Sequence, residues 1–357
     1  MEKSIVLLGS TGSIGVNTLL IAKRYNFRVE ALVAGKNIEL LNRQIEEFNP
    51  KFVAISDIKD KYKVNHSNIF IGESGILELL ELTNSQIIVN ALVGYVGLAP
   101  TLKAIELGRR VALANKESLV VAGEFIDMSK IVPIDSEHFG LWYLMNNRPL
   151  SKLYITASGG AFRDWKIEDM KRATFKEALN HPNWSMGNKI TIDSATMTNK
   201  LFELLEAKWL FNTTNIDAYI EKKSIIHALV EFKDGSTTAH FAGVDMKLPI
   251  AFALNSKIED EILPPVDLLK MGSIEFKPIT KERYPIWEIK EHILNNPHLG
   301  VIVNASNEEA IKKFEKGECN FFEMSKIVLD AYKKFENIRA KNIDDIIKID
   351  KEVRAYI

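Results

Sequence analysis

Two carboxylates stand close together in the segment Asp135-Ser136-Glu137-His138, which follows the apolar run 131–134. If the segment is extended, Asp135 and Glu137 point to the same side, because side chains alternate along a strand. Such a pair repels, and one member takes up a proton unless a cation lies between them. Oxygen ligands of this kind suit Mg²⁺ or Mn²⁺. The spacing therefore predicts a metal site, although a solvated strand end has the same pattern.

A second acidic pair, Glu203 and Glu206, lies three positions apart in a segment of helical character and so shares one face. Either glutamate could complete the metal site, and an exposed acidic helix face is the alternative. The small polar run 193–200 leads into this helix. Its hydroxyl, carboxamide and ammonium donors suit a phosphate monoester dianion, and they belong to Ser194, Asn199 and Lys200.

A glycine-rich loop, residues 9–15, follows the first apolar run and opens a helical segment. In dinucleotide-binding loops of this form the first glycine permits a tight turn, the second admits the pyrophosphate, and the third lets the helix pack on the sheet. The phosphates bind at the helix N-terminus. The alternative is a strand-to-helix turn without a ligand. The candidate cofactor contacts in the loop are Gly9, Thr11, Gly12, Ser13 and Ile14.

The second expected strand ends at Val33 and is followed closely by Gly35-Lys36-Asn37. NAD enzymes usually have an acidic residue here, which binds the ribose 2′-hydroxyl. Lys36 instead offers a positive charge that could neutralise a 2′-phosphate. We therefore expect NADPH, with a surface lysine at a helix start as the alternative.

Polar groups also follow a later strand of the same region, in Asn115-Lys116-Glu117. Ligands bind outside the carboxyl ends of parallel strands. We therefore expect Asn115 and Glu117 to face the cofactor, and Lys116 to bind a substrate oxygen. An ordinary helix start is the alternative.

Two loops in the middle of the chain have features of a binding site. Ser158-Gly159-Gly160 can form a backbone nest that favours an anion, or simply a turn. The loop 181–187 carries Trp184 and Met186, which are apolar for an exposed loop. Such residues suit a lid that closes over substrate and excludes water, or a loop docked on the core.

Alternating apolar and helical segments in the first third predict a doubly wound parallel sheet of the Rossmann type. The expected strands are 5–8, 29–33, 52–55, 87–90, 111–114 and 131–134, and the expected helices are 16–24, 38–48, 76–82 and 98–107. Further on, strand-like runs 152–156, 224–232 and 237–241 indicate an α+β region with a hairpin. The amphipathic stretches 308–316, 324–334 and 343–356 predict a C-terminal helical bundle.

These patterns predict four parts: 1–135 as the NADPH-binding domain, 136–260 as the metal- and substrate-binding domain, 261–290 as a linker, and 291–357 as the helical domain. A length of 357 residues agrees with more than one core.

Bulk properties narrow the function. The net charge of −1 and the lack of a long basic block argue against a nucleic-acid partner. Cys319 is the only cysteine, so an intramolecular disulfide and a cysteine-based zinc site are excluded, and a reducing cytoplasm fits. The first apolar run is too short for a signal peptide, and no run approaches a membrane span.

Taken together and in order, these motifs resemble the 1-deoxy-D-xylulose 5-phosphate reductoisomerase family. The resemblance implies an NADPH- and metal-dependent homodimer that rearranges and reduces 1-deoxy-D-xylulose 5-phosphate to 2-C-methyl-D-erythritol 4-phosphate in isoprenoid synthesis. It implies that Asp135, Glu137 and Glu203 bind Mg²⁺ or Mn²⁺, and that these three and Lys116 are the catalytic residues. The region 136–260 would also form the dimer.

The same resemblance assigns the substrate contacts. Lys116, Ser136 and Glu137 would meet the carbonyl and hydroxyl end. The phosphate end would be held by Ser158, His181, Ser194, Asn199 and Lys200. Trp184 and Met186 would form the lid, with Gly187 near the nicotinamide.

Two other functions are compatible with parts of the pattern. A metal-independent NADPH dehydrogenase of another small substrate would show no dependence on divalent cations. A non-catalytic NADP-binding regulatory module would tolerate replacement of Asp135 and Glu137.

Overall fold

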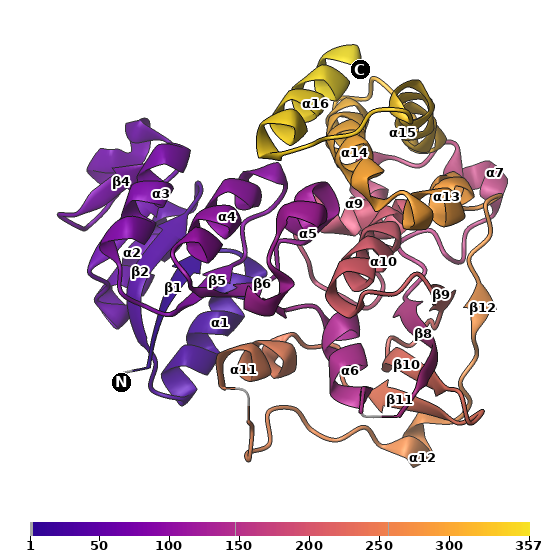
Figure 1. Cartoon of the computed structure of the whole chain (residues 1–357), viewed down its shortest axis with the longest axis horizontal. Coiled ribbons are helices and arrows are strands. Elements are labelled where there is room, and N and C mark those ends of the chain that lie inside the picture. The colour runs from indigo at the N-terminus through magenta and orange to yellow at the C-terminus, as the bar shows by residue number, and fades with distance from the viewer. Residues whose placement is uncertain (1–2, 147, 256) are drawn as a thin grey trace. The chain divides into compact units, whose positions relative to one another are not determined.

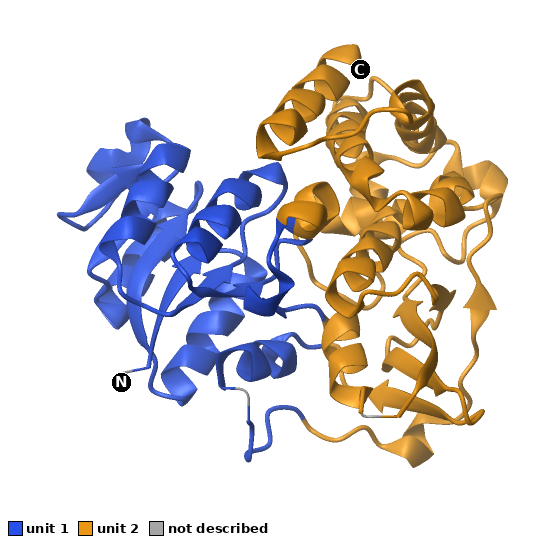
Figure 2. Ribbon diagram, in the orientation of Figure 1, with its two compact units in different colours: residues 1–118, 126–135, 245–263 blue, residues 119–125, 136–244, 264–357 orange. Residues whose placement is uncertain are grey.

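The computed structural model describes residues 3–146, 148–255 and 257–357 (Figure 1). The chain forms two compact units (Figure 2). Unit 1 comprises residues 1–118, 126–135 and 245–263, and unit 2 comprises 119–125, 136–244 and 264–357. The four-part division expected from the sequence stays a prediction. The return of residues 245–263 to unit 1 was not foreseen.

Unit 1 is built on a parallel sheet of seven strands in the order β4-β3-β2-β1-β5-β6-β7. The strands are β1 Ser4–Leu8, β2 Arg28–Ala34, β3 Phe52–Ile55, β4 Ile69–Ile71, β5 Ile87–Asn90, β6 Arg110–Leu113 and β7 Ile131–Pro133. The six predicted strands are confirmed to within one residue, and the three-residue β4 was missed. The strand order reverses direction beside β1, which is the switch point where open α/β sheets bind ligands.

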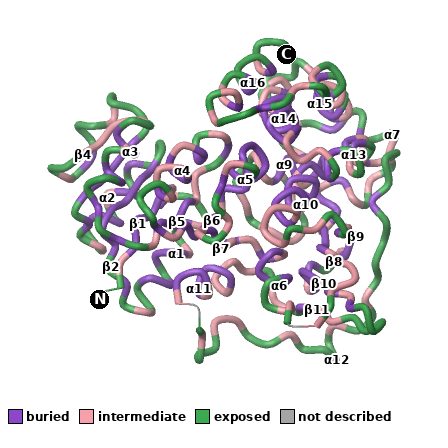
Figure 3. Tube along the Cα trace, in the orientation of Figure 1, coloured by how far each residue is buried: buried purple, intermediate pink, exposed green. Residues whose placement is uncertain are grey.

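The helices of unit 1 connect and cover these strands. They are α1 Ser13–Arg24, α2 Ile38–Phe48, α3 Gly72–Leu82, α4 Leu98–Glu106 and α11 Lys247–Asn255, with the short 3₁₀ turns Ile58–Lys63, Tyr95–Gly97 and Met128–Lys130. All four predicted helices are confirmed. The unforeseen α11 packs against α1. Strand β1 is buried nearly throughout (Figure 3), as expected for a parallel strand covered on both faces.

Unit 2 contains a five-stranded sheet in the order β11-β10-β8-β9-β12. Its strands are β8 Leu150–Ala157, β9 Ile216–Ile220, β10 Ile226–Phe232, β11 Thr237–Phe241 and β12 Lys277–Pro278. The predicted hairpin is confirmed as the antiparallel pair β10–β11. Strand β12 pairs with β9 inside the segment expected to be a linker. One sheet face is buried under α6, Ser136–Leu144, where Gly140 lies against Ala228.

The other helices of unit 2 include the predicted C-terminal bundle. They are α7 Ile167–Met170, α8 Phe175–Ala178, α9 Asn188–Thr196, α10 Thr198–Phe211, α12 Leu268–Met271, α13 Lys290–Asn295, α14 Gly300–Glu315, α15 Phe321–Phe335 and α16 Ile343–Tyr356. Short 3₁₀ turns lie at Gly123–Phe125, Pro285–Ile289 and Pro297–Leu299, and α5 spans Lys116–Ala122. Arg354 ties α16 to α14 through Glu308 at 2.8 Å and Glu309 at 3.0 Å.

Among the residues that the structure describes, no helix has the length and apolar character needed to cross a bilayer.

Candidate metal and substrate site

The segment that carries Asp135 and Glu137 is not extended, so that expectation was wrong. Helix α6 begins at Ser136, which puts Glu137 in its first turn. Carboxylate oxygens of Asp135, Glu137 and Glu203 nevertheless all lie within 4.8 Å of one another. We call these three residues the carboxylate trio. A helix start directly after Asp135, rather than the alternation of a strand, brings the first two acids together.

Glu203, the third member of the trio, lies on α10 and is 2% exposed. The polar run 193–200 spans the end of α9, a junction at Met197, and the first turn of α10. Met197 has a φ of 71°, and this left-handed residue lets one helix end and the next begin without a loop. Asn199 and Lys200 lie four and three residues before Glu203 on α10, so the three side chains share one helix face. Asn199 Nδ2 donates to Glu203 Oε1 at 2.5 Å.

Lys200 connects two members of the trio. Its Nζ lies 3.0 Å from Glu137 Oε1 and forms a second ion pair with Glu203 Oε2. Ser136 Oγ donates to Glu137 Oε2 at 2.6 Å. Lys116 Nζ lies 3.4 Å from Asp135 Oδ2. Charged groups this deeply buried require partners of opposite sign, and the two ammonium groups supply them.

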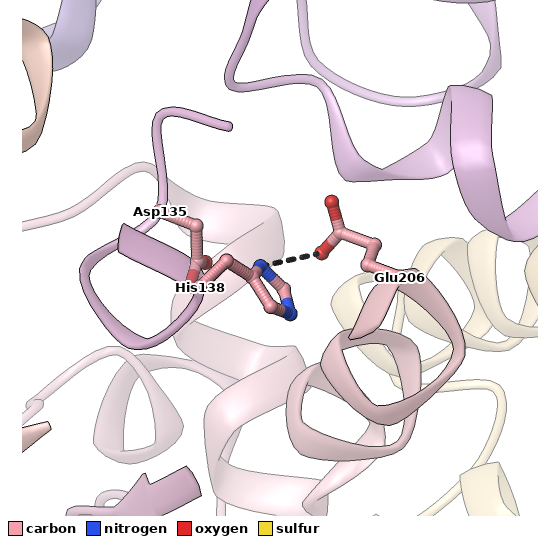
Figure 4. A group of neighbouring side chains, drawn as sticks. All are labelled: Asp135, His138 and Glu206. Atoms are coloured by element: carbon pink, nitrogen blue, oxygen red, sulfur yellow. Dashed lines mark ion pairs between the residues drawn. The ribbon is translucent and has the colours of Figure 1, made fainter. Parts of the chain in front are cut away.

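The trio fits a hard divalent cation, since its ligand atoms are all carboxylate oxygens. A second group, Asp135, His138 and Glu206, also lies within 4.8 Å (Figure 4). There His138 Nδ1 is 3.8 Å from Glu206 Oε2, while Nε2 lies 2.8 Å from the Glu203 carbonyl oxygen, to which it must donate. An imidazole ligand favours transition metals over Mg²⁺. The sequence had given His138 no role, and the structure links it to the backbone of a trio member.

Ser158, Gly159 and Gly160 form a turn with successive positive φ angles of 90° and 71° at the two glycines. The anion-favouring nest expected here from the sequence stays a prediction, and the Gly160 N–H donates to Ser158 Oγ. A Cβ at Gly160 would fall within 3.0 Å of the backbone at Ser194 and Ala195 on α9. Glycine is therefore needed for the turn to approach Ser194. We call Ser158, Gly159, Gly160, His181 and Ser194 the anion seat.

The hydrogen bonds of His181 fix its tautomer. Its Nδ1 accepts from the backbone N–H groups of Asn183 at 3.2 Å and Trp184 at 2.9 Å. Nε2 therefore carries the proton and donates to Ser158 Oγ at 2.8 Å. Since Ser158 Oγ also accepts from the Gly160 N–H at 3.2 Å, its own proton is left to donate to a ligand.

Burial lowers the pKa of His181 to about 4, helped by the positive charges of Arg163 and Lys200. The imidazole is therefore neutral near pH 7, with its one N–H committed to Ser158.

Arg163 organises the anion seat and was missed in the sequence. Its Nη1 donates to the carbonyl oxygens of Ser158 at 2.9 Å and Lys222 at 2.8 Å. Tyr284 donates its hydroxyl to the Gly159 carbonyl at 2.8 Å. These donors hold the loop carbonyls on one side. An arginine three residues after a glycine pair was the only signal in the sequence, and its contact with Lys222 could not be predicted from that signal.

The residues 181–187 form a loop between α8 and α9, as predicted. Trp184 packs edge-on against His227, with ring centroids 6.2 Å apart. Asn183 Nδ2 donates to the Lys222 carbonyl and to Ser224 Oγ, each at 2.7 Å. The loop base is thus fixed to the sheet, Met186 is half-buried, and Gly187 is the exposed N-cap of α9.

In unit 1 the glycine-rich loop joins β1 to α1 and fits a pyrophosphate. Gly9 has a φ of 88°, and a Cβ there would fall within 3.0 Å of the Ala91 carbonyl. A Cβ at Gly15 would fall equally close to Gly9 and Ser10. The predicted roles of these glycines in the turn and in close packing are confirmed. Gly12 and Ser13 are exposed at the start of α1, while Thr11 and Ile14 are half-buried.

The remaining candidate cofactor residues fall into an exposed and a buried group. Gly35, Lys36 and Asn37 are exposed after β2, and Asn37 caps α2 by accepting from the Leu40 N–H at 3.1 Å. Asn115 is buried and donates to the carbonyls of Leu92 at 2.9 Å and Gly94 at 2.8 Å.

The carboxamide of Asn115 also donates to Glu117 Oε2 at 3.1 Å. These bonds hold residues 92–94 beside β6. They commit the Asn115 side chain within the protein, and the contact of this residue with a cofactor stays a prediction.

Three family models match the chain in succession. They describe 1-deoxy-D-xylulose 5-phosphate reductoisomerase at residues 5–123, the C-terminal domain of that enzyme at 131–211, and the DXP reductoisomerase C-terminal domain at 241–356. The chain belongs to this family. The reductoisomerase of Nautilia profundicola is 60% identical, over 99% of this chain and 98% of its own length. That of Wolinella succinogenes is 49% identical, over 99% of both chains.

Solved reductoisomerase structures share the fold. A DOX-P reductoisomerase in complex with NADPH, fosmidomycin and magnesium has a TM-score of 0.89 and 32% identity, covering 99% of this chain and 97% of its own. The Zymomonas mobilis reductoisomerase in complex with NADPH has a TM-score of 0.89 and 30% identity, covering 99% and 98%. The family predicted from the motifs is therefore confirmed, as is the fold class.

Proposed function

We propose that this chain catalyses the NADPH- and divalent-metal-dependent rearrangement and reduction of 1-deoxy-D-xylulose 5-phosphate to 2-C-methyl-D-erythritol 4-phosphate, a step of isoprenoid precursor synthesis. The observation that carries this proposal is the position of Lys200. It pairs with Glu137 and Glu203, and it lies in the first turn of α10, directly after the end of α9, where Gly160 of the anion seat packs on Ser194 and Ala195; the candidate metal site and the anion seat therefore adjoin. A short sugar phosphate matches both sites, because it has carbonyl and hydroxyl oxygens for the metal and a phosphate for the anion seat.

Asp135, Glu137 and Glu203 would hold Mg²⁺ or Mn²⁺. When bound, such a cation polarises the carbonyl and hydroxyl oxygens of the substrate, which eases the carbon-skeleton rearrangement. Lys116, beside Asp135, is positioned to donate to a substrate oxygen. Ser136 and Glu137 would meet the same end of the substrate.

The phosphate end would be held by Ser158, His181, Ser194, Asn199 and Lys200. The Ser158 hydroxyl is oriented to donate, because His181 and Gly160 both donate to its oxygen. Anchoring the substrate by this remote group lets its binding energy orient the reacting end. Trp184 and Met186 would then close over the substrate and exclude water.

The NADPH pyrophosphate would bind the loop 9–15 at the N-terminus of α1, where N–H groups and the helix dipole favour an anion. Lys36 would neutralise the 2′-phosphate, and NADPH supplies the hydride for the reduction. Contacts of the cofactor with Asn115, Glu117 and Gly187 remain predictions.

We also propose a homodimer formed through unit 2. The sheet face opposite α6 is half-exposed and carries aromatic and aliphatic groups, among them Tyr154, Tyr219 and Leu229. The two tyrosine rings stack with centroids 5.2 Å apart. Aromatic residues are enriched at subunit interfaces, so this half-exposed face is a candidate for the contact. A cytoplasmic location, which the single cysteine favours, is part of the same proposal.

The test is the oxidation of NADPH in the presence of 1-deoxy-D-xylulose 5-phosphate, followed by absorbance with and without Mg²⁺. Turnover that requires both the sugar phosphate and the cation supports the proposal. Turnover of another substrate without a cation would favour a plain dehydrogenase. NADPH binding with no turnover under any condition would favour a regulatory module.

A further inference from the structure

The side chains that hold Glu137 and Glu203 are those proposed to bind the substrate. Lys200 pairs with Glu137 Oε1 and Glu203 Oε2, Ser136 donates to Glu137 Oε2, and Asn199 donates to Glu203 Oε1. Each of the four carboxylate oxygens is therefore hydrogen-bonded to, or ion-paired with, one of three residues that are proposed to bind the substrate. The inference drawn from this overlap rests on the proposed function and concerns the order in which the metal ion and the substrate bind.

A divalent cation bound by Glu137 and Glu203 needs lone pairs of their carboxylate oxygens, and Lys200, Ser136 and Asn199 now contact these oxygens. Lys200 is the critical donor, because it contacts both carboxylates and is only 4% exposed. Its ammonium and a divalent cation would repel one another strongly in so dry a place. The Lys200 ammonium and the divalent cation therefore cannot both contact Glu137 and Glu203 at the same time.

We infer that Lys200 is a stand-in cation for the carboxylate trio, which a divalent metal ion displaces, and that the displaced ammonium then binds the substrate phosphate in the anion seat. Metal binding would release Ser136 and Asn199 in the same way. The trio thus stays neutralised at every stage, and the substrate-binding donors become available when the metal is in place.

The destination of the ammonium lies within reach. Lys200 is in the first turn of α10, directly after the junction at Met197, and α9 carries Ser194 of the anion seat up to that junction. Its positive charge already acts on His181. Because linkage is reciprocal, metal and phosphate must then each strengthen the binding of the other.

The test measures Mn²⁺ affinity, with free Mn²⁺ followed by electron paramagnetic resonance, on the full chain after removal of metal by a chelator. Lys200→Met removes the competitor, so it should bind Mn²⁺ more tightly than the native protein, by roughly 5- to 150-fold, the usual range of coupling between sites. The matched control is Lys290→Met, which removes a 13% exposed lysine paired with Asp217 at 2.8 Å. Its Mn²⁺ affinity should remain native. An unchanged or weakened Mn²⁺ affinity in Lys200→Met overturns the inference.

A measurement at high salt distinguishes direct competition between Lys200 and Mn²⁺ for the carboxylates from long-range repulsion between the two charges. At 1 M salt the screening length is about 3 Å, so long-range effects of a lost charge vanish while competition for buried oxygens persists. The gain in Lys200→Met should survive this salt. Its disappearance would mean that Lys200 acts only at a distance and would refute the exchange.

The native protein provides a measurement that does not depend on the folding of a variant. Methylphosphonate, a small phosphate mimic, should bind more tightly at saturating Mg²⁺ than without it, by calorimetry. No gain would refute the exchange. Failure of the proposed function looks different: Mn²⁺ would bind the native chain and Glu203→Gln equally, because the trio would then be no metal site.

Discussion

Replacing Arg163 by methionine tests how the anion seat is held. The change keeps an unbranched apolar stem and removes the guanidinium that donates to the carbonyls of Ser158 at 2.9 Å and Lys222 at 2.8 Å. The Lys222 carbonyl keeps a donor, because Asn183 Nδ2 lies 2.7 Å away. The Ser158 carbonyl, at the start of the turn, is therefore the group most affected.

A hydrogen bond from a charged donor contributes roughly 1.5–3 kcal/mol. Losing the Ser158 bond fully and the Lys222 bond in part should lower the free energy of unfolding by about 2–4 kcal/mol. The Ser158 hydroxyl, which the Gly160 N–H and His181 orient toward a ligand, would no longer be held in place. We expect methylphosphonate affinity to fall about tenfold, which corresponds to about 1.4 kcal/mol.

Urea unfolding gives the free energy of unfolding, and calorimetry gives the affinities for methylphosphonate and NADPH. NADPH affinity should be unchanged, because its loop belongs to unit 1. Arg163→Lys should recover only part of the loss, since an ammonium lacks the planar fork of a guanidinium. Arg172→Met, at an exposed position, is the control and should behave like the native protein. Native stability and anion affinity in Arg163→Met would refute the reasoning, and an equal loss of NADPH affinity would indicate global damage instead.

Four further outcomes are expected. Lys36→Ala should weaken NADPH binding by roughly 1–3 kcal/mol, as for one charge-assisted contact, while NADH binding stays the same. If calorimetry shows an equal loss of affinity for both cofactors, Lys36 does not contact the 2′-phosphate. Chelation should abolish turnover and Mg²⁺ restore it, and Glu203→Gln should cut both turnover and Mn²⁺ affinity with NADPH affinity intact; turnover of the chelated protein would contradict the metal site. Tryptophan fluorescence should change when a phosphonate-hydroxamate mimic binds, and Trp184→Phe should remove most of that change; a signal that survives the substitution would come from another indole. Burial and the charges of Arg163 and Lys200 hold the pKa of His181 near 4, against 6.5 when unfolded, so its contribution to stability is complete above pH 6.5 and is lost as pH falls toward 4. His181→Gln should therefore make the urea midpoint less dependent on pH across this window. An unchanged pH dependence would mean that another group titrates there.

Local chemistry was enough to predict most of unit 1. Runs of β-branched and aliphatic residues such as Ile5–Leu8 suit strands buried on both faces, and the helices between them follow from periodicity. Gly9 and Gly15 could be identified from their spacing, because a turn of that length leaves no room for a Cβ. The carboxylates and phosphate donors were also predicted, since their residue types carry the chemistry.

Tertiary structure alone decided how these groups meet. Glu137 and Glu203 lie far apart in sequence. They converge because α10 begins at Thr198, directly after the junction at Met197, and α6 begins at Ser136, where an extended segment was expected. The short strands β9 and β12 form only through pairing, so their local signals are weak.

Arg163 shows the same limit at the level of one side chain. Its partners are backbone carbonyls, which every residue has, so no residue type marked Ser158 or Lys222 as its acceptors. The sequence by itself determined which chemical groups this protein has and the parallel sheet that carries the cofactor loop. Only the folded chain decided which donors those groups share, because long-range contacts are set by packing of whole elements rather than by local preference.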